Sequence, residues 1–106
     1  MNVLMSEDLL ELYEKGSCRR YKDVSRNPEL MQGFLRAVKV LSDAVHVDEL
    51  SGFSFLHYEK LRYQLSGMSS VRLSNRYVHR LLFREHSDGI EVCLIEIDDT
   101  HYGNKR

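Results

Sequence analysis

Arginines recur along the second half of this chain at positions where neighbouring strands would present them together. Residues 60–84 hold six cationic side chains and no acidic one. The six are Lys60, Arg62, Arg72, Arg76, Arg80 and Arg84. The whole chain has a formal net charge of only −1, so the positive charge is concentrated locally. Guanidinium groups match the oxygens of a phosphate bidentately, and the stretch therefore predicts a phosphate-binding face.

The pattern of Ser69–Arg84 predicts a β-hairpin. Apolar and polar residues alternate before a turn at Ser74–Arg76, and they alternate again over Tyr77–Arg84. Successive side chains of a strand point to opposite faces of its sheet. Arg72 and Arg80 are therefore expected to lie on neighbouring strands and to share one face.

The tail Ile97–Tyr102, with the sequence IDDTHY, adds groups that can exchange protons. His101 can do so near neutral pH, Asp99 can orient its ring, and Tyr102 offers a phenol. Cleavage of RNA without a metal needs a base for the 2′-hydroxyl, cations for the charge that develops at phosphorus, and an acid for the leaving 5′-oxygen. The tail and the arginine pair together contain a candidate for each role.

The same residues also have a simpler interpretation. An isolated strand arginine is usually a solvated residue of the outer face, and a histidine near a chain end is usually exposed. His57 and His79 are interpreted as structural, because His79 shares its expected face with Leu81 and Phe83, as a hydrogen-bonded core histidine would. The basic stretch Ser17–Arg26 is interpreted as a solvated loop or a helix entry, with a second phosphate contact as the alternative.

Length and composition indicate a single domain over residues 1–106, with 42% hydrophobic and 29% charged residues. The two cysteines are far apart, and the five histidines are scattered without the spacing of a zinc site. We therefore expect free thiols, no metal and no cofactor. No secretory leader and no apolar run of membrane-spanning length is visible, so a cytoplasmic location without a membrane partner is expected.

Helices are expected over Glu7–Lys15 and Pro28–Ala44, preceded by the capping residues Ser6 and Asn27. The strands expected besides the hairpin are Met1–Met5, Phe55–His57, a loosely defined Lys60–Leu65, and Ile90–Ile97. This order predicts an α+β fold, in which two N-terminal helices pack on one face of a twisted, mainly antiparallel sheet of about four strands.

Four short motifs follow one another in the second half of the chain: Leu56-His57-Tyr58-Glu59-Lys60, Ser70-Val71-Arg72-Leu73, Arg80-Leu81-Leu82-Phe83 and Asp98-Asp99-Thr100-His101. In this order they resemble motifs of the RelE/ParE superfamily of toxin–antitoxin toxins, most nearly those of the HigB-like host-killing toxins. The resemblance covers roughly the second half of the chain. The N-terminal helices match that family in order and length only, and the resemblance implies a RelE-like fold.

The resemblance implies a ribosome-dependent endonuclease that enters the ribosomal A site and cleaves mRNA there without a metal. Arg72 and Arg80 would stabilise the transition state, and Lys60 would contact phosphate or help to lower the pKa of the 2′-hydroxyl. His101, together with Asp99, would transfer the proton. The remaining cations of residues 60–84 would contact RNA or the ribosome: Arg62, Arg76 and Arg84.

Thr100 stands where the family pattern has a tyrosine, and Tyr102 is the candidate to replace it. The resemblance also implies a cognate antitoxin, expected to be a helix-turn-helix protein of the HigA type. That antitoxin would mask the toxin, and operator DNA would be contacted only through the complex of the two proteins. Two alternatives stay open: a ParE-like toxin that inhibits DNA gyrase without cutting RNA, and an inactive interaction module.

Overall fold

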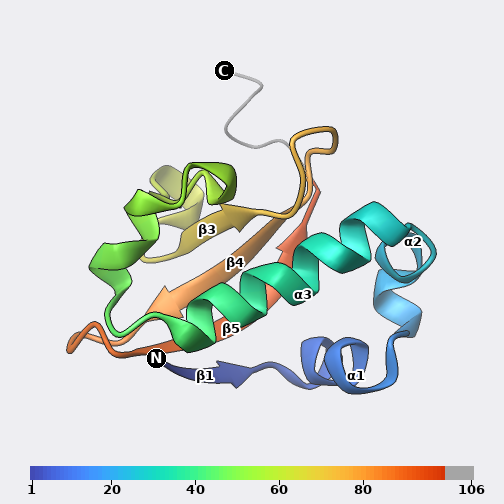
Figure 1. Ribbon diagram of the computed structural model, residues 1–106, viewed down its shortest axis with the longest axis horizontal. Helices are drawn as coiled ribbons and strands as arrows, with labels where there is room; N and C mark the ends of the chain where they lie inside the picture. Colours follow the sequence, from blue (N-terminus) through green and yellow to red (C-terminus); the bar gives the residue numbers. More distant parts are fainter. Residues whose placement is uncertain (100–106) are drawn as a thin grey trace.

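The structure is a computed structural model, and it describes residues 1–99. Helices cover one face of a five-stranded sheet with the strand order β1-β5-β4-β3-β2 (Figure 1). The strands are β1 (Asn2–Met5), β2 (Glu59–Lys60), β3 (Ser69–Arg72), β4 (Arg80–Glu85) and β5 (Glu91–Asp98). β1 runs parallel to β5 and the other pairs are antiparallel. The predicted α+β fold is confirmed, and the sheet gains a fifth strand because the two residues of β2 pair with β3.

The two predicted helices, α1 (Glu7–Lys15) and α3 (Pro28–Asp43), begin and end close to the predicted positions. A short third helix, α2 (Lys22–Ser25), was not predicted and lies in the basic stretch Ser17–Arg26. The side-chain oxygen of Asn27 accepts hydrogen bonds from two backbone N–H groups and caps α3. Ser6 precedes α1 as predicted, but its hydroxyl donates to the carbonyl of Ile95 and does not cap the helix. No helix within residues 1–99 is long and apolar enough to cross a membrane.

The core lies between α1, α3 and the inner face of the sheet. Its largest fully buried members include Leu9, Leu12, Phe34, Leu41, Leu81, Phe83 and Leu94. Gly33 lies at a close approach of α3 to the hairpin, because a Cβ atom at that position would lie 1.9 Å from the carbonyl oxygen of Leu73. The hairpin is thus seated directly against the backbone of α3.

The predicted hairpin is confirmed, but its second strand begins at Arg80 and not at Tyr77. The connection between the strands is held by side-chain contacts to α3 and leaves the ladder. Glu29 of α3 accepts a hydrogen bond from the hydroxyl of Ser74. Its other carboxylate oxygen pairs with Nη1 of Arg76 at 3.0 Å. These contacts hold the turn at its predicted position, Ser74–Arg76, and β4 begins only after the connection, at Arg80.

Two strands predicted between the helices and the hairpin are wrong or much shorter than expected. Phe55–His57 is not extended, because it overlaps a 3₁₀ turn that ends at His57 in a left-handed conformation with φ 48°. Of Lys60–Leu65 only Lys60 belongs to a strand, and Tyr63 also has a positive φ, of 59°. The short 3₁₀ helices of the chain are Arg19–Tyr21, Val47–Gly52, Ser54–Leu56 and Tyr63–Leu65.

Candidate functional site

Arg72 and Arg80 lie directly opposite each other on β3 and β4. Their neighbours Val71 and Leu81 also pair, and both are fully buried in the core beneath the helices. Because side chains alternate along a strand, the two arginines project from the sheet face that points away from the helices. The exposed Arg84 follows on the same side of β4, about 13 Å further along the strand. We call Arg72, Arg80 and Arg84 the arginine face.

Arg80 is held by an ion pair with Asp98, which lies opposite it on β5. Its Nε donates to Oδ2 of Asp98 over 3.2 Å, and the two side chains are only 14% and 8% exposed. Within residues 1–99, the two Nη groups of Arg80 have no hydrogen-bond partner. The carboxylate therefore fixes one edge of the guanidinium, and the remaining donors are suited to an anion.

Arg72 is anchored differently, through the loop of the hairpin. Its Nη2 donates to the backbone carbonyl of Tyr77 over 2.7 Å. Its Nε is buried and has no hydrogen-bond partner in the part of the chain that the structure describes. A buried donor without an acceptor costs about 1–3 kcal/mol. Arg72 lies opposite Arg80, whose Nη groups are unpaired within residues 1–99, which makes the two arginines a candidate anion site.

Lys60, the third predicted cation of the site, lies at the β2 edge of the sheet. It pairs with Ser69, whose side chain alternates onto the same side as Val71 and away from Arg72. Its Nζ lies 3.6 Å from Oε1 of Glu85, and its side chain is 73% exposed. The structure does not bring Lys60 to the arginine pair, and its catalytic role stays a prediction.

Glu85 is the centre of a small polar cluster beside Lys60. The hydroxyl groups of Tyr58 and Ser69 both donate to its Oε2 atom, the second over 2.6 Å. Burial raises the pKa of the Tyr58 phenol, and the adjacent carboxylate raises it further. The Tyr58 ring stacks on Phe83, so the cluster joins the β2 edge to the core.

The other predicted contacts with RNA or the ribosome have separate environments. Arg76 pairs with Glu29 and also lies 5.6 Å from the ring centroid of Tyr77. Arg62 is exposed just before the last 3₁₀ turn. The candidate proton-transfer residues His101 and Tyr102 lie outside the described residues, so their roles stay predictions.

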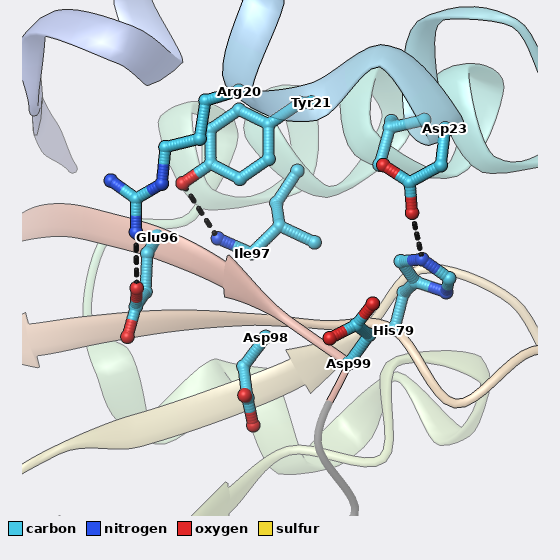
Figure 2. A pocket seen from close by; sticks show the side chains of 9 residues that line it. Arg20, Tyr21, Asp23, His79, Glu96, Ile97, Asp98 and Asp99 are labelled. Carbon is cyan, nitrogen blue, oxygen red and sulfur yellow. Dashed lines mark hydrogen bonds and ion pairs between the residues drawn. The ribbon is translucent and has the colours of Figure 1, made fainter.

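A pocket of about 260 Å³ lies at the end of β5, beside α2 (Figure 2). Its polar lining includes Arg20, Asp23, His79, Glu96 and Asp99, and we call it the acidic pocket. Nε2 of His79 donates to Oδ2 of Asp23 over 2.7 Å. Arg20 pairs with Glu96 at 2.6 Å. The predicted role of Asp99 beside the arginines stays untested, while the structure places this carboxylate at the pocket.

The partner of His79 is a residue that the sequence does not indicate. A hydrogen-bonded histidine was expected here, and the hydrogen bond is present, but its acceptor Asp23 lies 56 residues away at a pocket wall. Asp23 is the one acid in the basic stretch Ser17–Arg26. Nearby, the phenol oxygen of Tyr21 accepts from the backbone N–H of Ile97, and burial raises the pKa of this phenol.

Solved structures share this arrangement of helices and strands. A YoeB/ParE toxin from Agrobacterium tumefaciens is 14% identical, with a TM-score of 0.54 and coverage of 94% of this chain and 99% of that one. A chain of the YoeB–YefM complex from Staphylococcus aureus is 18% identical, with a TM-score of 0.56 and coverage of 96% and 98%. The chain has the fold of these toxins. No protein-family model and no curated protein matches its sequence. The RelE-like fold that the sequence resemblance implies is thereby confirmed.

Proposed function

We propose that this chain is the toxin of a type II toxin–antitoxin pair, and that it cleaves mRNA on the ribosome. The observation that carries the proposal is the opposed pair of Arg72 and Arg80 on the outer sheet face, with the outer donors of Arg80 unpaired within residues 1–99. The fold shared with the toxin from Agrobacterium tumefaciens supports a toxin role. The ordered motifs of the second half favour the RNA-cleaving branch of that superfamily.

The proposed reaction is an attack of the 2′-hydroxyl on its own phosphate. The O2′–P bond forms and the P–O5′ bond breaks, which leaves a 2′,3′-cyclic phosphate and a free 5′-hydroxyl. Arg72 and Arg80 would neutralise the charge that builds up on the phosphoryl oxygens, where fixed donors are most effective. His101, with Asp99, would move the proton, and Lys60, Tyr102 and the other cations of residues 60–84 would assist or bind the substrate.

The proposed partner is a cognate antitoxin that covers or obstructs the arginine face. The Staphylococcus aureus neighbour was solved as a complex of YoeB with YefM. By analogy, a small protein encoded beside this chain should restore growth when both are expressed. We propose a helix-turn-helix protein of the HigA type, which would also carry the complex to operator DNA.

The decisive experiment combines induced expression in bacteria with cleavage of mRNA on purified ribosomes in the presence of EDTA. Arg72→Ala and Arg80→Ala should each slow cleavage by about 2–4 kcal/mol of transition-state stabilisation. His101→Ala should also relieve toxicity. Cleavage products mapped by primer extension should appear only when the ribosome is present.

Lys39→Ala is the matched control, because Lys39 is exposed on α3 and pairs only with Asp43 within residues 1–99. This variant should cut as fast as the native chain, and circular dichroism should show that all variants are folded. Undiminished cleavage by both arginine variants would overturn the proposed site. Inhibition of gyrase supercoiling without any cleavage would establish the ParE-like alternative in its place.

A further inference from the structure

Three side chains that no local motif links meet at one wall of the acidic pocket. Asp23 comes from α2, His79 from the residue before β4, and Asp99 from the residue after β5. Each offers one ligand atom, and the three atoms lie within 4.8 Å of one another. Figure 2 shows the carboxylate of Asp23 above the imidazole ring of His79 and the carboxylate of Asp99 to the left of the ring.

One imidazole nitrogen and two carboxylate oxygens form a donor set suited to a divalent transition metal. Zinc is commonly bound by three protein ligands of these types, with water in the fourth position. The pocket has room for such waters, since its volume is about 260 Å³. A purely acidic cluster on a flat surface would lack both the nitrogen ligand and the enclosing walls.

The charges of the pocket also favour a cation at this wall. Glu96 is already paired with Arg20, and Asp98 is paired with Arg80. Within residues 1–99, neither Asp23 nor Asp99 forms an ion pair with a lysine or arginine. Two carboxylates without a lysine or arginine partner favour a cation at this wall, and a divalent ion would supply that charge.

The geometry at His79 identifies the binding nitrogen. Nε2 lies 2.7 Å from Oδ2 of Asp23, whereas Nδ1 is buried. A metal at Nε2 would displace the proton from that nitrogen, and the proton of the neutral ring would then lie on Nδ1. Within the described residues Nδ1 has no acceptor. Metal-binding histidines usually donate their second N–H to a partner, so we expect micromolar binding and not the affinity of a closed structural zinc site.

We propose that Asp23, His79 and Asp99 form a binding site for a divalent transition metal, with Zn²⁺ as the first candidate. The site lies on the helix side of the sheet, because His79 and Arg80 are consecutive and point to opposite faces. The proposal does not depend on RNA cleavage. A bound metal would join α2 to the ends of β4 and β5.

The test uses the untagged full chain and Zn²⁺ alone, followed by calorimetry and thermal unfolding. One equivalent of Zn²⁺ should bind in the micromolar range and raise Tm. His79→Gln and Asp99→Asn should each weaken binding by about 100-fold or more, since loss of an outer-shell partner alone costs 10–100-fold. His86→Gln is the matched control, because His86 is an exposed histidine that pairs with Asp88 elsewhere.

Co²⁺ provides a spectroscopic readout that separates this site from its rival. A second group of possible ligands, Asp8, Glu11 and the buried Cys18, is also present. Binding at His79 should give visible d–d bands without a sulfur-to-cobalt charge-transfer band, and Cys18→Ser should leave the spectrum unchanged. A charge-transfer band that disappears in Cys18→Ser would overturn the proposal. So would Zn²⁺ affinity that is unchanged in both His79→Gln and Asp99→Asn, or the absence of binding at micromolar metal.

Discussion

The arginine face and the acidic pocket adjoin at the ends of β4 and β5, where Asp98 both pairs with Arg80 and lines the pocket. Arg80 points outward and pairs with Asp98, while His79 points toward α2 and bonds to Asp23. One region gathers guanidinium donors from β3 and β4, and the other gathers carboxylates from α2 and β5. The comparison teaches that strand alternation lets one short segment serve two sites of opposite charge, provided that the hairpin is seated firmly on the helices.

The largest expected effect is that of a substitution at Gly33, where the hairpin packs against the backbone of α3. A methyl group there would meet the backbone carbonyl of Leu73 at 1.9 Å, and backbone cannot move aside as a flexible side chain can. Gly33→Ala should therefore lower the free energy of unfolding by about 3 kcal/mol or more. It should also weaken both the arginine face and the acidic pocket.

Urea denaturation followed by circular dichroism measures this loss. Gly52→Ala is the matched control, because nothing lies within 4 Å of a Cβ atom placed at Gly52. The control should stay within about 0.5 kcal/mol of the native chain. Equal stability of the two variants would show that α3 and the hairpin do not touch as described.

Arg80→Lys should impair the arginine face and leave the acidic pocket unchanged. The lysine keeps a positive charge near Asp98, but it replaces the guanidinium fork with a single ammonium group. Cleavage of mRNA should fall by about 100-fold, or about 2.7 kcal/mol, while the affinity for Zn²⁺ changes less than twofold. Ribosomal cleavage rates and calorimetry on the same preparation check this. A parallel loss of mRNA cleavage and of Zn²⁺ affinity would mean that the two sites are coupled through the sheet.

Local patterns of the two regions could be predicted from the sequence, whereas contacts between residues far apart in the sequence could not. Strand alternation acts between neighbours, so the shared face of Arg72 and Arg80 could be predicted. Asp23 and His79 are 56 residues apart, and only the packing of α2 against the hairpin brings them together. The alternating aromatic residues of Phe55–His57 suggested a strand, but the left-handed backbone of His57 turns the chain there.

The tether between α3 and the hairpin turn should matter more to the arginine face than to the acidic pocket. Glu29 accepts hydrogen bonds from Ser74 and Arg76, so Glu29→Ala should release the turn and lower the free energy of unfolding by about 1–2 kcal/mol. The exposed Glu14 has no ion pair within residues 1–99, and Glu14→Ala is the control. Urea denaturation and Zn²⁺ titration together check that stability falls while metal affinity is retained.

The smallest expected effects come from the two residues predicted as helix caps. Asn27 accepts from the N–H groups of Glu29 and Leu30 at 3.0 and 3.2 Å, so Asn27→Ala should cost about 1 kcal/mol. Its position between α2 and α3 means that the loss should also loosen the wall that carries Asp23.

Ser6 makes no capping bond and donates to Ile95 over 2.9 Å. Ser6→Ala should therefore cost only the net value of one hydrogen bond, at or below about 1 kcal/mol, and should leave Zn²⁺ binding unchanged. Thermal unfolding with and without Zn²⁺ distinguishes the two, and a larger loss in Ser6→Ala would show that α1 is capped by Ser6 after all.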